Sequence, residues 1–146
     1  MEPLKYAFSD KPGEITPIPP LGKHPTDAGM DVCALQGGII LPFGYRVFRT
    51  GLHFNIPEGF VLQAWPKSRH HWLMGAGIID SGYLGEVLIK VVNYSPWPVR
   101  IRAGQQIAQL VLIPVLTPAL QQIPLEELLA GGSERGAAGG IAGQVK

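Results

Sequence analysis

Hydrophobic and polar positions alternate along residues 45–54, and this period of two is typical of a β-strand with one buried face. One set of positions holds Tyr45, Val47 and Arg49, and the other holds Arg46, Phe48, Thr50, Leu52 and Phe54. Turn signals precede and follow the stretch, at Pro42-Phe43-Gly44 and at Pro57-Glu58-Gly59. We therefore expect β-structure here, bounded by two tight turns.

Further apolar runs of strand length follow along the chain. The strands predicted from them cover residues 60–65, 86–94, 98–102 and 106–113, with turns at Ser95-Pro96 and Ala103-Gly104. Only residues 124–129 have a short helical pattern, with Pro124 at a first-turn position. Several short strands separated by turns predict an all-β fold, as a sandwich, a jelly roll or a barrel.

The two ends of the chain differ from its middle. Residues 1–27 are rich in proline and are predicted to be extended chain or an edge strand. Residues 131–146 are rich in glycine and contain almost no core-forming side chains. Such a segment is either a disordered tail or an arm that orders over a ligand or a neighbouring subunit. We expect a β domain over residues 1–130 and a flexible arm over residues 131–146.

Charge and cysteine content narrow the function classes. A formal net charge of +1 excludes the broad basic surface of a protein that binds duplex nucleic acid. Cys33 is the only cysteine, so neither an internal disulfide nor a cysteine-zinc site is possible, and a small buried apolar role is expected for it.

The chain has no segment expected to enter a membrane. Residues 1–14 contain no apolar leader, and the longest apolar run, residues 107–116, is too short to span a bilayer and contains Pro114. We therefore expect a cytoplasmic protein, or one in the host cytoplasm if it is viral, that binds no membrane.

Several common sites are excluded by their sequence signatures. The chain has no GxxxxGK[ST] phosphate loop, and residues 75–80 read GxGxxD without a surrounding βαβ pattern. His70 and His71 would point to opposite faces of a strand, which makes joint metal chelation unfavourable. Phosphates or metals must therefore be held in another way.

Four short polar or glycine-containing segments remain, each next to a predicted strand. They are TDAGMDV (26–32), PKSRHH (66–71), GAGIIDSGYLGEV (75–87) and AGQQIAQL (103–110). Alone, each is a weak signal, because an aspartate beside glycine, such as Asp80, is more often a turn residue than a base. Their order on a β scaffold, followed by an arginine in a glycine-rich tail, is more specific.

This pattern resembles the trimeric dUTPase family. The matching motifs, in order, are DAGMD (27–31), PKS (66–68), GIIDSGYLGE (77–86), GQQIAQL (104–110) and ERGAAGG (134–140). The resemblance implies a distorted jelly-roll β-barrel that assembles as a homotrimer, with active sites between subunits and a C-terminal arm that closes over them. It also implies hydrolysis of dUTP to dUMP and pyrophosphate.

The resemblance assigns roles at the base, the sugar and the reacting phosphorus. Asp80 matches the aspartate that activates water for attack on the α-phosphate, as a general base can. Tyr83 matches the tyrosine that packs against deoxyribose and leaves no room for a 2′-hydroxyl. Gly77 and Ile78 match positions that offer backbone groups to the uracil edge, where glycine permits a close approach.

The resemblance also assigns contacts to the triphosphate and its metal. The residues expected at phosphate oxygens are Lys67, Ser68, Arg69, Gln109 and Arg135, the last directed at the γ-phosphate. Asp31 matches an aspartate that meets Mg²⁺ through water. Mg²⁺ would bind mainly to the triphosphate, in keeping with its preference for phosphate oxygens and retained waters.

The chain departs from the family pattern at several positions. The family usually has arginine at the positions of Lys67, Leu84 and Gln106, so cationic contacts are changed or lost. The tail has GGIAGQ at residues 139–144, where the family usually has an aromatic residue that stacks on uracil. Another aromatic side chain, such as that of Trp72, would have to replace it.

Two alternative functions stay open. One is a non-catalytic or regulatory dUTPase-like trimer, which the altered tail motivates. The other is the dCTP deaminase branch of the same fold, which carries a glutamate ten residues after the matching aspartate. This chain has Lys90 at that position, which disfavours the deaminase.

Overall fold

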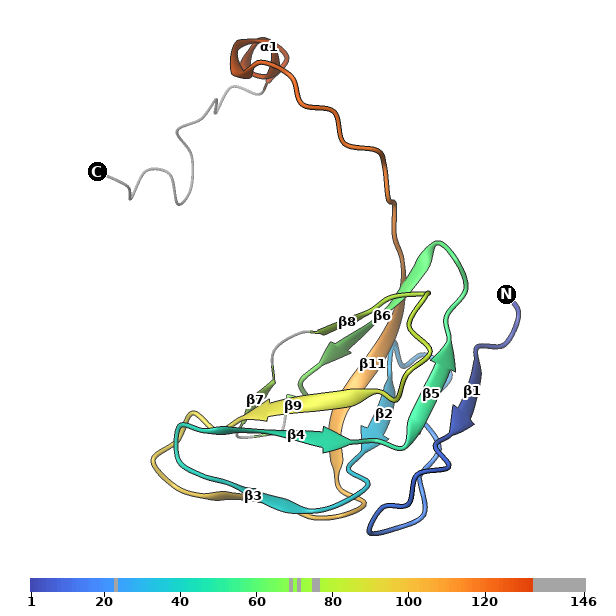
Figure 1. The fold of residues 1–146 in the computed structure, drawn as a ribbon, viewed down its shortest axis with the longest axis vertical. Coiled ribbons are helices and arrows are strands. Elements are labelled where there is room, and N and C mark those ends of the chain that lie inside the picture. The colour runs from blue at the N-terminus through green and yellow to red at the C-terminus, as the bar shows by residue number, and fades with distance from the viewer. Residues whose placement is uncertain (23, 69, 71, 75–76, 133–146) are drawn as a thin grey trace. The chain divides into compact units, whose positions relative to one another are not determined.

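The computed structural model describes residues 1–22, 24–68, 70, 72–74 and 77–132 (Figure 1). The chain divides into two units, residues 1–116 and 117–146. In the second unit, α1 (Leu125–Ala130) confirms the predicted short helix. Glu126 and Glu127 lie in its first turn, where negative charge is favourable to the helix dipole. The assignment of residues 131–146 as a flexible arm stays a prediction.

The first unit is built of β-strands, which confirms the all-β prediction (Figure 1). The strands are β1 (Lys5–Phe8), β2 (Met30–Cys33), β3 (Gly38–Ile40), β4 (Tyr45–Arg49), β5 (Leu52–Asn55), β6 (Phe60–Trp65), β7 (Leu73–Met74), β8 (Gly77–Ile79), β9 (Leu88–Val92), β10 (Val99–Ile101) and β11 (Gln106–Pro114). The strands β2, β3, β7 and β8 were not predicted, because two to four residues are too few to show an alternation.

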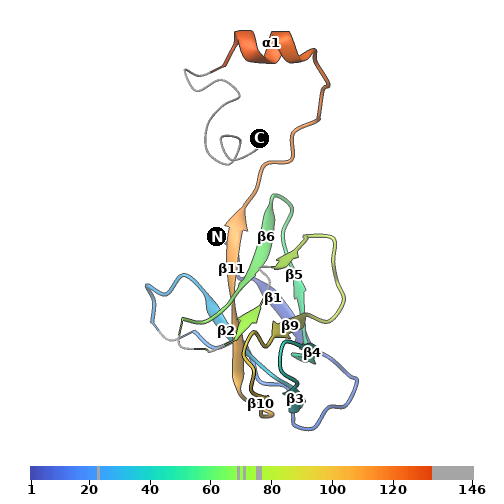
Figure 2. The ribbon, with the colours of Figure 1, turned by 90° about the vertical axis from the view of Figure 1, so that its left-hand side faces the viewer.

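The strands form four hydrogen-bonded sheets, and the described residues make no closed barrel. The largest sheet has the order β2-β11-β6-β8, and β11 is its long central strand (Figure 2). A second sheet has the order β4-β9-β7, while β1 pairs with β5 and β3 pairs with β10. The pairing of β1 with β5 alone confirms the edge strand predicted near the N-terminus.

The predicted alternation at residues 45–54 separates buried from exposed side chains. Phe48, Leu52 and Phe54 belong to the hydrophobic core, together with Ile89 and Leu110 of β9 and β11. Burying such side chains stabilises the fold by about 1.5–3 kcal/mol each. The sheets are therefore joined by one continuous core.

Arg46 is the exception to this alternation. Its side chain is exposed, with the guanidinium 6.0 Å from the centre of the Phe48 ring and one N–H donated to the Ile39 carbonyl. A charged head is cheaper to solvate than to bury, so the side chain leaves the core while remaining near it.

The predicted turns are confirmed, and they set the strand ends. Gly59 and Gly104 both have φ of +84°, a conformation that glycine adopts without steric cost.

Within the described ranges, no helix has the length and apolar composition needed to cross a membrane.

Candidate functional site

A buried ion pair lies at one end of the largest sheet. Asp31 is in the middle of β2 and Lys67 lies just after the end of β6, and the Lys67 Nζ atom is 2.5 Å from Asp31 Oδ1. The two side chains are 11% and 6% exposed for Lys67 and Asp31, respectively. In such a poorly solvated setting each charge stabilises the other more strongly than at a surface.

Gln109 completes this cluster from β11. Its Cα lies opposite Asp31 on one side and Trp65 on the other, and its Nε2 donates to the Pro66 carbonyl at 3.4 Å. The residues around it enclose a pocket of about 230 Å³, here called the ion-pair pocket, lined by Leu21, Asp27, Ala28, Gly29, Asp31, Lys67 and Gln109. Three segments distant in sequence thus bring a cation, an amide and carboxylates to one place.

Gly29 allows the strands around this pocket to approach closely. A Cβ atom there would lie 3.1 Å from the Leu110 carbonyl oxygen and 3.2 Å from Gln109 Oε1. A side chain at this position would push the pocket wall away from Gln109, so the motif around residue 29 has a packing reason for glycine.

Cys33 lies two residues beyond Asp31 and is buried, as expected from the sequence. Burial raises the pKa of its thiol, the negative charge of Asp31 raises it further, and Lys67 partly offsets this effect. Its thiolate is therefore disfavoured, in agreement with an apolar packing role.

A second cluster surrounds Asp80, directly after β8. Asp80 is exposed, and its carbonyl accepts the Tyr83 N–H at 3.0 Å, so its backbone begins a turn while the residue stays accessible to solvent. A pocket of about 230 Å³, here called the Asp80 pocket, is lined by Ile78, Ile79, Asp80, Tyr83, Val87 and Leu88. A turn role and a chemical role for Asp80 are therefore compatible.

The strand β8 offers backbone groups beside this pocket. In the described part of the chain, β8 pairs with β6 on one side and has no strand on the other. A Cβ atom on Gly77 would meet only the Ala64 Cβ atom, at 4.0 Å, so packing within the chain does not require glycine here. This leaves a strand edge that a ligand could approach closely.

The Tyr83 ring is held over the loop that follows Asp80. Its hydroxyl donates to the Glu86 carbonyl at 2.8 Å, and the side chain is 45% exposed. A Cβ atom on Gly85 would lie 2.6 Å from the Cζ and Oη atoms of Tyr83, so glycine is needed for this ring position.

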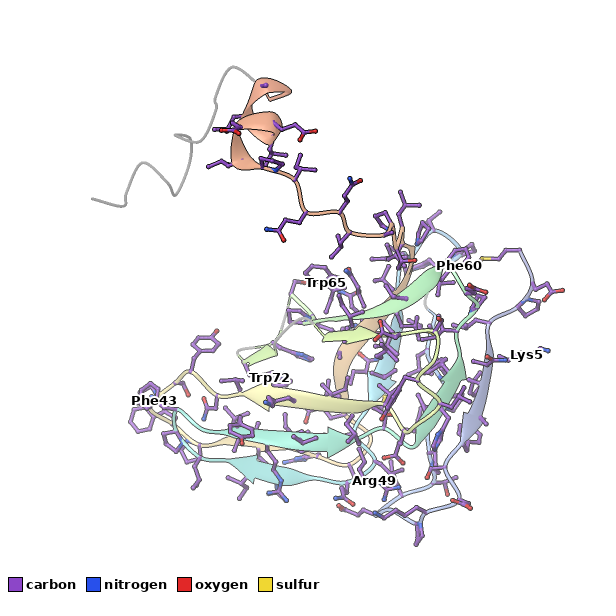
Figure 3. The ribbon with its side chains drawn as sticks, turned by 45° about the horizontal axis from the view of Figure 1, so that its top comes forward. Lys5, Phe43, Arg49, Phe60, Trp65 and Trp72 are labelled. Carbon is purple, nitrogen blue, oxygen red and sulfur yellow. The ribbon has the colours of Figure 1, made fainter. Side chains whose placement is uncertain are left out.

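The carboxylate of Glu86 is held by Arg49, at the end of β4 (Figure 3). Both carboxylate oxygens accept a guanidinium N–H at 2.8 Å, an arrangement that is strong because two charge-assisted bonds share one geometry. The hydrogen bonds from Arg49 hold the pKa of Glu86 below its usual value, although partial burial opposes the shift.

The strand registers place the two clusters at opposite ends of the largest sheet. Asp31, Gln109 and Trp65 lie in one row across β2, β11 and β6, whereas Asp80 follows Ile79, which pairs with Leu62. At ~3.3 Å per residue and ~4.8 Å per strand, Asp31 and Asp80 are separated by roughly 20 Å.

Neither pocket is large enough by itself for a sizeable ligand. Each has about 230 Å³, and pockets for small molecules usually have ~300–1,000 Å³. Because a base and the group it serves must be within hydrogen-bond reach, the two clusters of one chain cannot act on the same bond.

The structure sorts the predicted site residues into these two groups. It brings together Asp31, Lys67 and Gln109 in one group, and Gly77, Ile78, Asp80 and Tyr83 in the other. Ser68 is exposed in the turn that follows Lys67, where the His70 N–H donates to the Lys67 carbonyl. Arg69 and Arg135 lie outside the described residues.

Trp72 does not supply an exposed aromatic surface. It is 8% exposed within the hydrophobic core, and its ring stacks on His70 with centroids 4.0 Å apart (Figure 3). His71 lies outside the described residues, and the residues that the structure does describe contain no group of three or more His, Cys, Asp or Glu placed to hold a metal.

The sequence did not predict two features of the structure, the Arg49–Glu86 ion pair and the exposure of Trp65. Arg49 and Glu86 are 37 positions apart, and no local signal marks them as partners. Trp65 is 42% exposed beside Gln109, although its position at the end of an apolar run predicted only a strand (Figure 3).

Comparisons of sequence place the chain among known proteins. A family model described as dUTPase matches residues 16–139. The deoxyuridine 5′-triphosphate nucleotidohydrolase of Leifsonia xyli subsp. xyli is 34% identical over 127 residues, covering 82% of this chain and 81% of that protein. The enzyme of the same name from Candida albicans is 34% identical over 129 residues, covering 82% and 80% of the two chains.

Solved structures share the fold. A mutant dUTPase from Staphylococcus bacteriophage 80alpha, with dUpNHpp, matches with a TM-score of 0.82 at 26% identity, covering 99% of this chain and all of that one. A mutant dUTPase from phage phi11 of S. aureus, described with a structural Mg(II) ion, matches with a TM-score of 0.73 at 24% identity, covering 84% and 97%. The second likeness concerns the fold alone.

Proposed function

The chain belongs to the dUTPase family, and from this premise we propose that it hydrolyses dUTP to dUMP and pyrophosphate. The observation that carries the proposal is the division of the family-matching residues between two pockets with complementary chemistry. One pocket contains a fixed cation and an amide suited to phosphate oxygens, and the other contains an exposed carboxylate beside a tyrosine.

In the proposed reaction Asp80 is the catalytic residue. Its exposed carboxylate accepts a proton from a water molecule as that water attacks the α-phosphorus, and pyrophosphate leaves. General-base assistance of this kind accelerates a reaction by about 10²–10⁴-fold. Positioning and neutralisation of the triphosphate supply most of the remaining acceleration.

The nucleoside end is selected beside Asp80. The open edge of β8 offers the backbone of Gly77 and Ile78 to the uracil edge, and a mismatched base would leave these polar groups unpaired. The Tyr83 ring, held by its bond to Glu86, packs against deoxyribose and excludes a 2′-hydroxyl.

The phosphates bind at the ion-pair pocket. The residues proposed to contact them are Lys67, Ser68, Arg69, Gln109 and Arg135. Asp31 fits a water-mediated contact to Mg²⁺, because one or two carboxylates together with substrate phosphates are the usual setting for this ion. When bound, Mg²⁺ would neutralise charge on the triphosphate and orient its oxygens.

A homotrimer would join the two clusters. Cyclic assembly would place one chain's ion-pair pocket beside another chain's Asp80 pocket, and the separation of roughly 20 Å between the two clusters within one chain supports this arrangement. Residues 131–146 would close over the combined site as an arm. The cytoplasmic location stays a prediction.

The deaminase alternative has no support from the site. Lys90, at the position where that branch has its glutamate, is exposed on β9 with its Nζ 4.8 Å from the centre of the Tyr45 ring. It does not line the Asp80 pocket. The position therefore offers no second carboxylate for deamination.

Release of pyrophosphate from dUTP tests the proposal. The full chain is incubated with dUTP and Mg²⁺, alongside Asp80→Asn and the matched control Asp10→Asn, which removes an exposed carboxylate far from the motifs in sequence. The wild type and the control should release pyrophosphate, and Asp80→Asn should lose about 100-fold or more of the rate. Tight binding of dUTP without turnover at any Mg²⁺ concentration would instead identify a non-catalytic nucleotide-binding trimer.

A further inference from the structure

Hydrogen bonds join the loop of residues 80–87 to the segment of residues 49–53. The Val87 N–H donates to the Leu52 carbonyl at 2.8 Å, and the buried Thr50 hydroxyl donates to the Val87 carbonyl at 2.7 Å. His53 Nδ1 lies 2.8 Å from the Leu84 carbonyl oxygen, so this nitrogen carries the proton, because a carbonyl only accepts. The loop that bears Asp80 and Tyr83 is therefore fixed by a short segment more than thirty positions earlier.

Arg49 makes the most extensive of these attachments. Besides both Glu86 carboxylate oxygens, its guanidinium binds the Pro12 carbonyl at 2.7 Å and the Lys11 carbonyl at 3.0 Å. The Arg49 and Glu86 side chains are only 15% and 14% exposed. A planar fork with several donors can satisfy all these acceptors at once, whereas a lysine ammonium cannot match the geometry.

Glu86 connects this attachment to the Tyr83 ring. Arg49 holds the Glu86 side chain, and the Glu86 backbone carbonyl accepts the Tyr83 hydroxyl. The ring is nearly half exposed, so packing restrains it on few sides. Its position then depends on the Glu86 carbonyl, which is held by the Val87 bonds to residues 50 and 52 and, through the Glu86 side chain, by Arg49.

We propose that Arg49 is a positioning residue for substrate selection: through Glu86 it fixes the Tyr83 ring, and so sets the discrimination between deoxyribose and ribose nucleotides. This inference rests on the proposed dUTP hydrolysis. Without the guanidinium, the Glu86 side chain loses its charged restraint, the acceptor of the Tyr83 hydroxyl is held by the Val87 bonds alone, and the ring yields space to a 2′-hydroxyl more readily. Discrimination should suffer more than turnover, because Asp80 precedes this part of the loop.

The test compares kcat/KM for dUTP and UTP in Arg49→Met and Arg49→Lys. We expect the dUTP-to-UTP ratio to fall about 10-fold or more in Arg49→Met, since displacements of ~1 Å at a positioned group have effects of this size. Arg49→Lys should lie between Arg49→Met and the wild type. Arg46→Met removes an exposed guanidinium from the same strand and should leave the ratio unchanged. A general loss of folded protein would lower both activities equally and leave the ratio intact.

Tyr83→Phe tests whether Arg49 acts on the dUTP-to-UTP ratio through the Tyr83 hydroxyl or independently of it. It removes the hydroxyl that joins the ring to Glu86, so Arg49→Met should change the ratio little in a Tyr83→Phe background. If the two effects multiply instead, or if the ratio in Arg49→Met equals that of the wild type, the proposal is overturned. Glu86→Gln, which keeps the shape of the side chain, serves if Arg49→Met does not fold.

Binding measurements keep this proposal distinct from the proposed reaction. If the wild type releases no pyrophosphate, the reaction is wrong, and the positioning role is then decided by calorimetry with dUpNHpp and its ribose counterpart. A ratio of the two affinities that falls in Arg49→Met supports the role of Arg49 even without turnover. Equal ratios in both proteins contradict it.

Discussion

The ion-pair pocket and the Asp80 loop differ in how their polar groups are held. In the ion-pair pocket, Asp31 and Lys67 are buried and hold each other through opposite charges, between strands of the largest sheet. In the loop, Asp80 is exposed, and the attachments to Arg49 and its neighbours reach the residues that follow it. Under the proposed function, the phosphate-binding charges would be pre-organised within one chain, while the reacting carboxylate would be left open for a surface supplied by another chain.

Of the substitutions considered, removal of the Lys67 charge from the ion-pair pocket should lower the free energy of unfolding the most. Lys67→Met removes the cation that lies against the buried Asp31 carboxylate, and the loss of one partner of a buried pair costs about 3–5 kcal/mol. Asp80→Asn, in the exposed loop, should change the free energy of unfolding by no more than about 0.5 kcal/mol. Urea unfolding at one fixed protein concentration measures both values.

A double variant provides the control for this experiment. Asp31→Asn combined with Lys67→Met removes both charges and should recover much of the lost stability, because the buried carboxylate charge is removed together with its cation. If Lys67→Met alone is as stable as the wild type, the folded protein does not depend on the pairing of Asp31 with Lys67.

The bond between Arg49 and Glu86 should have a smaller, pH-dependent effect. Because the pKa of folded Glu86 lies below its unfolded value of about 4.3, its stabilisation is present above that pH and is lost as the pH falls through the folded value. Glu86→Gln should therefore lower the free energy of unfolding by about 1 kcal/mol at pH 7, and the difference should vanish in acid.

Urea unfolding of wild type and Glu86→Gln from pH 7 to pH 3 checks this dependence. Asp80→Asn in the same series is the matched control, since Asp80 is exposed and its substitution should give a small difference. A difference between wild type and Glu86→Gln that grows as the pH falls would have the wrong sign for this account.

Much of the fold could be predicted because long alternating segments report on burial directly. The positions of Phe48, Leu52 and Phe54 followed from a period of two, and the turns at residues 42–44 and 57–59 followed from proline and glycine. The short strand β8 could not be predicted, because three residues carry no period. Its formation depends on pairing with β6, which is a tertiary interaction.

The candidate site residues could be named from the sequence, but their arrangement within one chain could not. The motifs identified Asp31, Lys67 and Asp80 as chemically important, yet only the strand registers place the first two roughly 20 Å from the third. The partner of Glu86 was also invisible, because Arg49 lies 37 positions away and looked like one more residue of an alternating strand. Contacts between distant segments are set by topology, which local patterns do not encode.

Complementation between two inactive variants tests whether one chain's ion-pair pocket acts with another chain's Asp80. Asp80→Asn disables one cluster, and Lys67→Gln disables the other while its amide can still donate a hydrogen bond to Asp31. The two variants are unfolded together in equal amounts and refolded, and pyrophosphate release is compared with that of each variant refolded alone. The refolded mixture should recover about one quarter of the wild-type activity, since each of the two chains that form a site carries the required intact cluster with a chance of about one half. No recovery on mixing, with each variant folded and trimeric, would contradict the account.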